Sequence, residues 1–460
     1  MGLWSAMRSR LLCRLVAVLV TIGVGSVIAL TLELASPTEA FAKDKATKAK
    51  KKKPKKFTYA QRGNSAKVSV RARKPARARV ETPRFYSREV KTIGELEPIS
   101  LKMQDGVPVL TEIPRFSSQF QGRIAGRTPD NKVLYFTIDP GLQAYAQQLV
   151  DRAAAPHIAI VAMDPETGRL LAVAAKSQSI KELATHNGFP AASLFKIITS
   201  AAAIERGGVQ PWSPVRFRGG NYTLNELNYK TNELLDRRVM TMEEGLGKSC
   251  NPVFARLALN YLNSPVLRYY AKVFGFNSHI DTDIELPESS AFIPSEEFDF
   301  SRAAAGFGDV YISPIHAAVM MSQVAAGGQR PRPFLVDQML TQEGKMLYQA
   351  RPQSQSILRP ATARTLLEMM EATTTIGTSR REFMRNNRPV FPNLRVAAKT
   401  GTLTGGNPGG LNHWFIAAAP IEDPKLAIAI IAVDARGAEA KASRLGRKMF
   451  ARFFNLPSEI

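Results

Sequence analysis

Ser193 and Lys196 form the only S-x-x-K pattern in the sequence, and they open a segment that predicts a helix as far as Glu205. Three residues of separation place both side chains on one helical face, where an unprotonated lysine amine can take the serine hydroxyl proton. Burial would have to lower the lysine pKa for this reaction to run near neutral pH. The helix dipole would also stabilise negative charge that develops beside the nucleophile. The pair predicts a serine nucleophile with a lysine base, although the pattern alone is common.

Two further motifs follow in order along the chain. Ser249, in the run Lys248-Ser249-Cys250-Asn251, lies 56 residues after Ser193. Lys399, in the run Lys399-Thr400-Gly401-Thr402, lies 150 residues after Ser249 and directly follows a predicted strand. S-x-x-K, S-x-N and K-T-G in this order are the signature of the active-site-serine penicillin-recognising enzymes. The three together are far more specific than S-x-x-K by itself.

From about Lys132 to Val433 the chain resembles the transpeptidase domain of the penicillin-binding proteins. The likeness extends to blocks that flank the three motifs: Phe136-Thr137-Ile138-Asp139 with Leu142-Gln143, Gly306-Phe307-Gly308 with Ile312-Ser313-Pro314 and Gly327-Gly328, and His413-Trp414-Phe415. The resemblance implies the fold, the chemistry and the residue roles that this family shares.

By this resemblance, four residues would carry the acyl-transfer chemistry. Ser193 would be the nucleophile and Lys196 its general base. Ser249 would relay a proton to the leaving amine, and Lys399 would supply positive charge near that serine. The backbone N–H groups of Ser193 and Thr402 would form the oxyanion hole.

The resemblance also implies a set of substrate-binding residues. Asn251 would hold a peptide amide of the substrate, while Thr400 and Thr402 would bind its terminal carboxylate. Gly401 would let the substrate lie close along the strand. Cys250, between two motif residues, is expected to point away from the site and to serve in packing.

Other catalytic classes have little support in the sequence. A Ser-His-Asp enzyme is the obvious rival, yet no G-x-S-x-G surrounds any serine and the chain has only five histidines. We interpret His413 as a structural or substrate-lining residue. No Cys/His spacing suggests a metal site, and Cys13 and Cys250 form no disulfide framework, so we expect neither a metal nor a cofactor.

The order of the predicted elements indicates a mixed α/β (α+β) fold. Apolar runs predict a hairpin from 157–163 and 170–174, and three more strands at 396–398, 414–419 and 426–433. A helix-rich middle separates the two groups, and a last helix is expected at 438–454. We therefore expect a predominantly antiparallel five-stranded sheet, flanked by helices and accompanied by a helical subdomain.

Four regions are expected along the chain. Residues 1–42 would be a basic n-region followed by a membrane anchor or signal peptide, and residues 43–80 a disordered basic linker. Residues 81–131 would be a small N-terminal segment, and residues 132–460 the penicillin-binding transpeptidase domain. No stretch resembles a glycosyltransferase domain, so we expect a monofunctional protein.

The N-terminal region predicts export from the cytoplasm. Basic residues at 8, 10 and 14 precede Leu15 to Leu32, an uncharged stretch of eighteen residues that is long enough to span a bilayer. We favour an uncleaved single-pass anchor in the cytoplasmic (inner) membrane, with the catalytic domain outside the cytoplasm. Ala40-Phe41-Ala42 is a small-x-small pattern, so cleavage after Ala42 would instead give a periplasmic protein.

Most of the formal net charge of +23 comes from residues 43–80, where sixteen Lys or Arg face a single acid, Asp44. Such a tract repels itself and predicts an extended spacer. It conflicts with the positive-inside rule for the proposed orientation, which we assign from the chemistry instead. The tract is also suited to contact with anionic lipid or acidic wall polymers. Nucleic acid is not an expected partner.

Together these features predict a peptidoglycan D,D-transpeptidase that cross-links stem peptides through an acyl-enzyme on Ser193 and that β-lactam antibiotics acylate. A D,D-carboxypeptidase or a β-lactamase of the same fold is the alternative within the family. We favour transpeptidation because the interval from S-x-N to K-T-G is long and no counterpart of a deacylating carboxylate is evident. A non-catalytic receptor or scaffold that binds β-lactams or wall peptides is the alternative of another class.

Overall fold

The computed structural model describes residues 87–457. The expected anchor or signal at 1–42 and the expected linker at 43–80 lie outside the described residues, as do the first residues of the 81–131 segment. Within residues 87–457, no helix is both long enough and apolar enough to cross a lipid bilayer.

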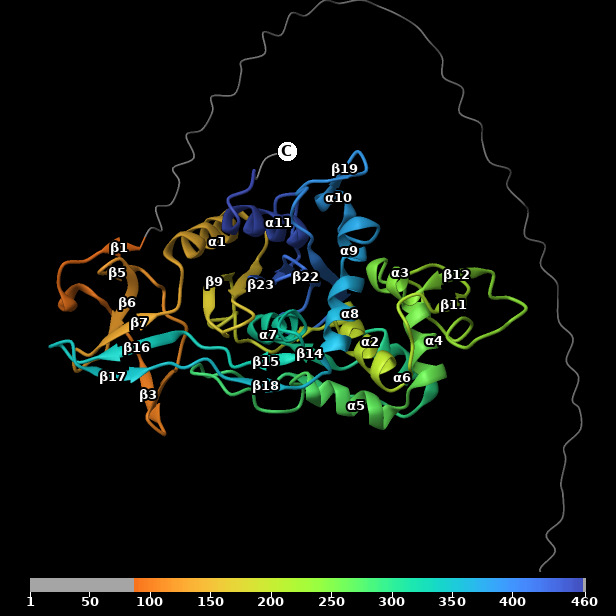
Figure 1. The fold of residues 1–460 in the computed structure, drawn as a ribbon, viewed down its shortest axis with the longest axis horizontal. Coiled ribbons are helices and arrows are strands. Elements are labelled where there is room, and N and C mark those ends of the chain that lie inside the picture. Colours follow the sequence, from red (N-terminus) through yellow and green to blue (C-terminus); the bar gives the residue numbers. More distant parts are fainter. Residues whose placement is uncertain (1–86, 458–460) are drawn as a thin grey trace, which may run out of the picture. The chain divides into compact units, whose positions relative to one another are not determined.

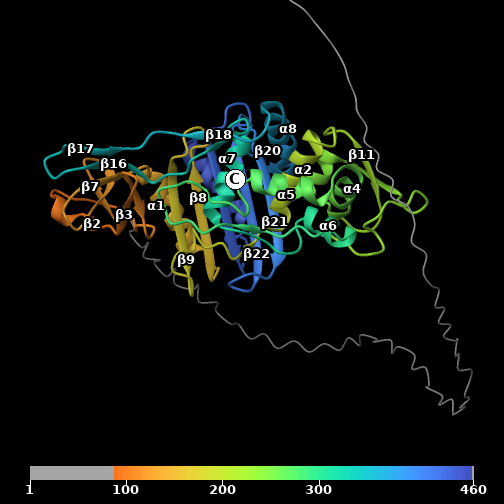
Figure 2. The same cartoon turned by 90° about the horizontal axis from the view of Figure 1, so that it is seen from below.

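A five-stranded antiparallel sheet lies at the centre of the described fold (Figures 1 and 2). Ile430, for example, pairs with Phe415 on one side and with Ile160 on the other. The inner strands are continuous apolar runs because both faces of the sheet are covered. The fold class expected from the sequence is thereby confirmed. In spatial order the strands are β21 (Ala397–Thr404), β22 (Leu411–Ala419), β23 (Leu426–Val433), β8 (His157–Met163) and β9 (Leu170–Ser177).

Helices cover both faces of this sheet. Alternate strand residues point to opposite faces, so Ile431 packs with α7 (Pro314–Ala325), whereas Ile430 packs with α1 (Pro140–Arg152) and α11 (Ala442–Phe453). Figure 1 shows α1 and α11 on one side of the sheet and α7 on the other. The first strand, β21, has no strand on its outer side, and this edge faces the helical subdomain.

The helical subdomain is built from the middle of the chain (Figure 1). An ion pair in its interior fixes the long loop between β11 (Pro214–Phe217) and β12 (Arg238–Thr241). Asp236, fully buried, receives hydrogen bonds from both Arg218 and Arg256. Removing one partner of such a pair typically costs about 3–5 kcal/mol, because the other charge stays buried. The helices are α2 (Lys196–Glu205), α3 (Met242–Gly247), α4 (Asn251–Tyr261), α5 (Ser264–Val273), α6 (Glu297–Ala304), α8 (Pro360–Met370), α9 (Ala372–Thr375) and α10 (Arg380–Phe383).

A second sheet joins the start of the described chain to its middle. Its central strand, β7 (Val133–Phe136), pairs with β6 (Arg123–Arg127) on one side and with β16 (Val336–Leu340) on the other. The sheet therefore spans the boundary that the sequence suggests near residue 132, and that boundary stays a prediction. The remaining strands are β1 (Arg88–Glu89), β2 (Glu97–Pro98), β5 (Ser118–Phe120) and β17 (Met346–Gln349).

Short two- and three-stranded sheets complete the described fold. One of them matters for the site, because β10 (Phe189–Pro190) pairs with β14 (Val310–Ile312) just before Ser193. The others are β13 (Ser290–Ala291) beside β14, β3 (Leu101–Gln104) with β4 (Val107–Leu110), β15 (Gln329–Pro331) with β18 (Ser354–Ser356), and β19 (Met384–Arg385) with β20 (Arg388–Pro389).

Candidate active site

Ser193 lies in a short 3-10 turn, Ala192–Phe195, that runs directly into α2. The chain reaches this turn from β10, and the Ala191 N–H donates a 2.8 Å hydrogen bond to the Val310 carbonyl. Ala192 takes a left-handed backbone conformation, with φ of +50°. The predicted helix therefore begins with a tight, strained turn that the neighbouring strand pairing holds in place.

Lys196 extends from the first turn of α2 into a fully buried position. Its Nζ lies 2.8 Å from Ser193 Oγ, 2.8 Å from Asn251 Oδ1 and 2.5 Å from the Ala305 carbonyl oxygen. Asn251 and Ala305 offer only acceptor oxygens at these contacts. A neutral amine has two N–H groups for these two acceptors and keeps its lone pair for the third neighbour, the serine hydroxyl.

Burial lowers the pKa of Lys196 well below its ordinary value, and the nearby charge of Lys399 lowers it further. Both effects disfavour the ammonium form, since a buried cation loses its hydration and a second cation repels it. The described residues place no carboxylate against Lys196 that would restore its charge. The local environment thus favours the amine that a general base requires.

Ser249 and Lys399 form a second hydroxyl and amine pair. Lys399, from β21, is fully buried, and its Nζ donates hydrogen bonds to Ser249 Oγ at 3.0 Å and to the Thr400 carbonyl at 2.8 Å. Burial lowers the pKa of Lys399 from 10.5 to about 7. Ser249 follows α3 in a left-handed conformation, with φ of +55°. Residues 150 positions apart in sequence are thereby brought into direct contact.

Asn251 begins α4 and connects the lysine to the loop before it. Its Oδ1 accepts from Lys196, while its Nδ2 donates to the Tyr222 carbonyl at 2.8 Å. One lone pair and one N–H of the side-chain amide remain for a further partner. The role in holding a substrate amide stays a prediction. Cys250, which precedes it, is buried, and burial raises the pKa of its thiol.

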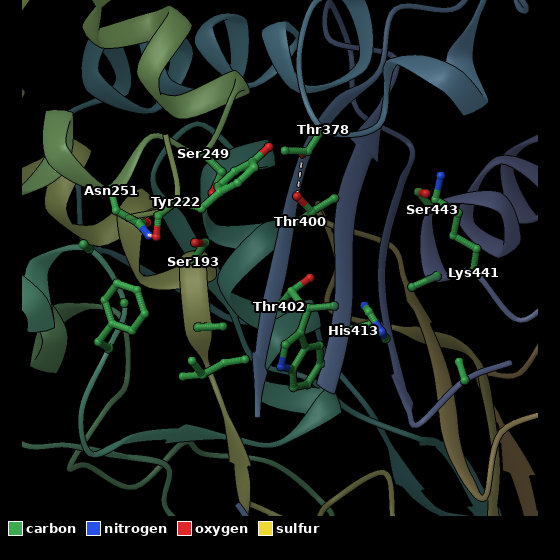
Figure 3. A pocket seen from close by; sticks show the side chains of 18 of the residues that line it. Ser193, Tyr222, Ser249, Asn251, Thr378, Thr400, Thr402, His413, Lys441 and Ser443 are labelled. Atoms are coloured by element: carbon green, nitrogen blue, oxygen red, sulfur yellow. Dashed lines mark hydrogen bonds between the residues drawn. The ribbon is translucent and has the colours of Figure 1, made fainter. Parts of the chain in front are cut away.

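A cavity of about 660 Å³ joins these groups to β21. Figure 3 shows Ser193, Ser249 and Asn251 on one side and Thr400 and Thr402 on the strand beside them. The Thr400 hydroxyl makes a 2.5 Å hydrogen bond with the hydroxyl of Thr378, and either oxygen can donate. The structure thus brings all eight predicted site residues to one region of the fold, while their individual roles stay predictions.

Two glycines allow the backbones around Ser193 to approach closely. A Cβ at Gly401 would lie 3.3 Å from the Ala191 carbonyl oxygen, so β21 itself packs against the turn before the serine. A Cβ at Gly306 would lie only 2.1 Å from the Ala192 carbonyl oxygen. Gly306 also has φ of +93°, which favours glycine. The Trp414 indole N–H donates to the Pro190 carbonyl at 2.9 Å and joins the sheet to the same segment.

Several cavity residues carry no motif and were not singled out from the sequence. They include Tyr222 on the β11–β12 loop, Thr378 between α9 and α10, and Lys441 and Ser443 at the start of α11. Their position depends on how distant segments fold together. His413 lines the cavity from β22, which agrees with the substrate-lining role, one of the two interpretations made from the sequence. Burial lowers the pKa of its imidazole.

Comparison with known proteins identifies the family. The family model described as "Penicillin binding protein transpeptidase domain" matches residues 158–454. The chain belongs to this family. The resemblance seen in the sequence motifs is thereby confirmed.

Curated relatives and solved structures agree with this assignment. The peptidoglycan D,D-transpeptidase PbpA of Mycolicibacterium smegmatis is 25% identical over 387 residues, which are 76% of this chain and 76% of the relative. The structure of penicillin-binding protein A from M. tuberculosis, as a ceftriaxone acyl-enzyme complex, aligns with a TM-score of 0.57 and 22% identity over 72% of this chain and 80% of that one. A D,D-transpeptidase domain from Eggerthella lenta aligns with a TM-score of 0.59 and 23% identity over 72% and 83%.

The close approach at Gly306 makes a testable prediction for this transpeptidase domain. Gly306→Ala places a methyl group against the Ala192 carbonyl and displaces the turn that carries Ser193. We expect covalent labelling by benzylpenicillin to slow roughly 100-fold, because displacements of about 1 Å at a reacting atom have effects of this size. The measurement is the second-order labelling rate, with the unfolding temperature recorded in parallel.

Gly308→Ala is the matched control. Gly308 has a similar φ of +85°, but a Cβ there meets nothing within 4 Å. Both variants carry the strain of a left-handed alanine, about 1–2 kcal/mol. Equal labelling rates in the two variants would show that the contact with Ala192 does not position Ser193.

Proposed function

We propose that this chain is a peptidoglycan D,D-transpeptidase that cross-links stem peptides through an acyl-enzyme on Ser193. The arrangement around Lys196 Nζ carries the proposal. Its two other neighbours are acceptor oxygens, so its lone pair is directed at Ser193 Oγ, 2.8 Å away. The names of the curated relatives support the same reaction class.

Acylation begins when Lys196 takes the proton of Ser193 as Oγ attacks the carbonyl carbon of the donor peptide's penultimate residue. The backbone N–H groups of Ser193 and Thr402 stabilise the resulting oxyanion. As the tetrahedral intermediate collapses, the bond to the terminal residue breaks and Ser249 passes a proton to the departing amine. Lys399, 3.0 Å from Ser249 Oγ, returns a proton to that hydroxyl and remains close to Lys196.

The second half of the reaction transfers the acyl group to an amine of a neighbouring stem peptide and releases Ser193. Water would compete if a carboxylate activated it beside the ester. None of the twenty described residues that line the cavity is Asp or Glu. This lining supports slow hydrolysis, and therefore transpeptidation or lasting inhibition by β-lactams, over rapid β-lactamase turnover.

The substrate's terminal carboxylate binds beside β21. Thr400 and Thr402 present hydroxyl groups there, and Asn251 keeps hydrogen-bonding capacity for a peptide amide. Thr378 positions Thr400 through their shared hydrogen bond. β-Lactams present a comparable amide and carboxylate, so they acylate the same serine.

We also propose that residues 15–32 hold the chain in the cytoplasmic membrane, with the catalytic domain outside the cytoplasm. The support is the uncharged stretch behind basic residues and a reaction whose substrate is wall peptide. Cleavage after Ala42 would leave a periplasmic protein instead. With either N-terminus, the basic residues 43–80 would reach anionic lipid or wall polymers.

Reaction with benzylpenicillin tests the assignment of the nucleophile. A soluble fragment from Glu81 is expected to gain one stable penicilloyl adduct on Ser193, whereas Ser193→Ala gains none. Among residues 87–457, no other hydroxyl lies 2.8 Å from a buried amine whose lone pair is free to accept its proton. Intact mass and peptide mapping provide the measurement.

Ser200→Ala is the control variant, because it also removes a serine hydroxyl from this region but should still be acylated on Ser193. An adduct that survives in Ser193→Ala would place the nucleophile elsewhere. Rapid antibiotic loss without a lasting adduct would indicate a β-lactamase, and an unreactive wild-type chain would favour a non-catalytic receptor or scaffold.

The two lysines predict a bell-shaped pH dependence of the second-order acylation rate. Lys196 must be neutral, so the rate falls as pH drops below its lowered pKa. Lys399 must carry a proton, so the rate falls as pH rises above about 7. The second-order constant reports the free enzyme. Stopped-flow or mass-based labelling measures both limbs between about pH 5 and 10, a range that reaches from acidic pH to near the ordinary lysine pKa.

Lys399→Arg separates the two limbs. An arginine stays protonated throughout this range, so the alkaline limb should disappear even if the larger side chain lowers the overall rate. If the alkaline limb persists in Lys399→Arg with an unchanged midpoint, another group is responsible for it.

The mass of the mature protein tests the membrane proposal. We expect a chain that begins at Met1 and stays with the membrane fraction after a high-salt wash, because an apolar span is held by burial and not by charge. A mature N-terminus at Lys43 in the soluble periplasmic fraction would replace the anchor with a cleaved signal.

A further inference from the structure

The active-site cavity continues past the predicted catalytic residues to the beginning of α11. Thr402 and His413 pair directly across β21 and β22, so their side chains share the sheet face that α11 covers. In Figure 3, Lys441 and Ser443 lie on the opposite side of these strands from Ser193. This second end of the cavity is lined by Ala435, Gly437, Ala440, Lys441, Ala442 and Ser443.

Ser443 is the central group at this end. Its side chain is only 4% exposed and lines the cavity, yet its hydroxyl has no hydrogen-bond partner among residues 87–457. The hydroxyl opens onto the cavity, where water can satisfy it until a ligand takes that place. The hydroxyl is therefore available to a group that enters the cavity.

The same turn offers backbone donors. α11 is twelve residues long and begins after Lys441, whose side chain does not cap it. The N–H groups of Ala442 and Ser443 donate to no acceptor in the described part of the chain. A helix N-terminus with free N–H groups is favourable for an anion, through both hydrogen bonding and the helix dipole.

The local charge is also positive. Lys441 is the one charged residue among the twenty described residues that line the cavity. Its partner Glu382 lies 3.1 Å from both Lys441 and Arg444 and so faces two cations. Glu439 is similarly shared by Arg444 and Lys448. These are three cations against two carboxylates. Asp434 and Arg436, which flank Ala435, add one charge of each sign, so an excess of positive charge remains at this end of the cavity.

We propose that this end of the cavity is a subsite for a second carboxylate of the donor stem peptide. The Ser443 hydroxyl and the first N–H groups of α11 bind the carboxylate, and Lys441 adds charge. The subsite is separate from the Thr400 and Thr402 hydroxyls that take the peptide's terminal carboxylate. It selects donor peptides that carry an additional acidic group away from the scissile bond. This inference rests on the proposed function of Ser193.

Pairs of β-lactams serve as probes, because their side chains take the place of the donor peptide. Carbenicillin is benzylpenicillin with a carboxylate on the side-chain carbon, and ampicillin has an ammonium group there. Ceftazidime carries a carboxylate on its oxime arm where cefotaxime has a methyl group, which places the charge farther from the lactam ring. The two also differ at the 3-position, so only the change in their rate ratio between wild type and variant is interpreted. The readout is the ratio of second-order acylation rates within each pair, compared between wild type and variant.

Ser443→Ala is expected to lower the ratio of acidic to neutral probe about tenfold in at least one pair, as for the loss of a hydrogen bond to a charged group. It leaves no protein group without a partner, so the fold should persist. Lys441→Gln should lower the same ratio. Ser443→Asp should lower the acidic-to-neutral ratio further and raise the ampicillin to benzylpenicillin ratio, because the new carboxylate repels anionic probes and attracts the ammonium group. Arg452→Gln removes an exposed cation from the last turn of α11, away from the subsite, and should leave the ratios unchanged.

The outcomes distinguish failure of the carboxylate subsite from failure of the proposed acyl-transfer function. If wild type reacts with no probe, the proposed function fails. If wild type is acylated by all probes but Ser443→Ala, Lys441→Gln and Ser443→Asp change neither acidic-to-neutral ratio by more than about twofold, the carboxylate subsite is wrong and the acyl-transfer assignment stands. A ratio that falls equally in Arg452→Gln would assign the effect to long-range charge and would also overturn the subsite.

Discussion

Two lysine amines lie in the interior of this protein without a carboxylate beside either of them in the described residues, and the rest of the site depends on this constraint. Lys196 and Lys399 are both fully buried. A buried ammonium group is costly, so burial lowers the pKa of both amines. Hydroxyl and carbonyl groups surround them. Lys196 is thereby kept beside Ser193 as the neutral amine that a base requires, and Lys399 is kept beside Ser249 with a pKa of about 7, at which it can give up a proton.

The elements that enclose Lys196 come from three parts of the chain. α2 supplies the lysine, α4 begins with Asn251, and the carbonyl of Ala305 follows the last turn of α6. Left-handed residues stand at or next to both hydroxyls, at Ala192 and Ser249. Such conformations cost about 1–2 kcal/mol each. They persist because strand pairing and close glycine contacts leave the backbone no room to relax.

The sequence predicted the central sheet and the acyl-transfer centre for different physical reasons. Strands such as β8 and β23 are long apolar runs buried on both faces, so their hydrophobicity alone predicts buried strands. The eight motif residues were found because S-x-x-K, S-x-N and K-T-G occur together in the order that the penicillin-recognising enzymes share. Thr378 and Ser443 were missed, since a hydroxyl on a loop or at a helix start has no distinctive pattern until distant segments meet.

The second sheet was missed for a related reason. Its strands β1 and β2 have only two residues each, too few to show an alternating pattern. It is completed by β16 and β17, about two hundred residues later in the chain. No local window of sequence contains this pairing, because β16, one of the two partners of β7, follows seven intervening α-helices, α1 to α7.

The position of β7 between β6 and β16 also determines where the chain can be shortened. A fragment that began at residue 132 would keep β7 and β16 but would lose β6, leaving one side of β7 as a row of unpaired N–H and C=O groups. Exposed strand edges of this kind recruit other chains and promote aggregation. A truncated form suited to crystallisation or inhibitor screening must therefore keep β6, and keeping β1, β2 and β5 on its other edge means a start before Arg88. Every predicted catalytic side chain nevertheless lies beyond residue 190.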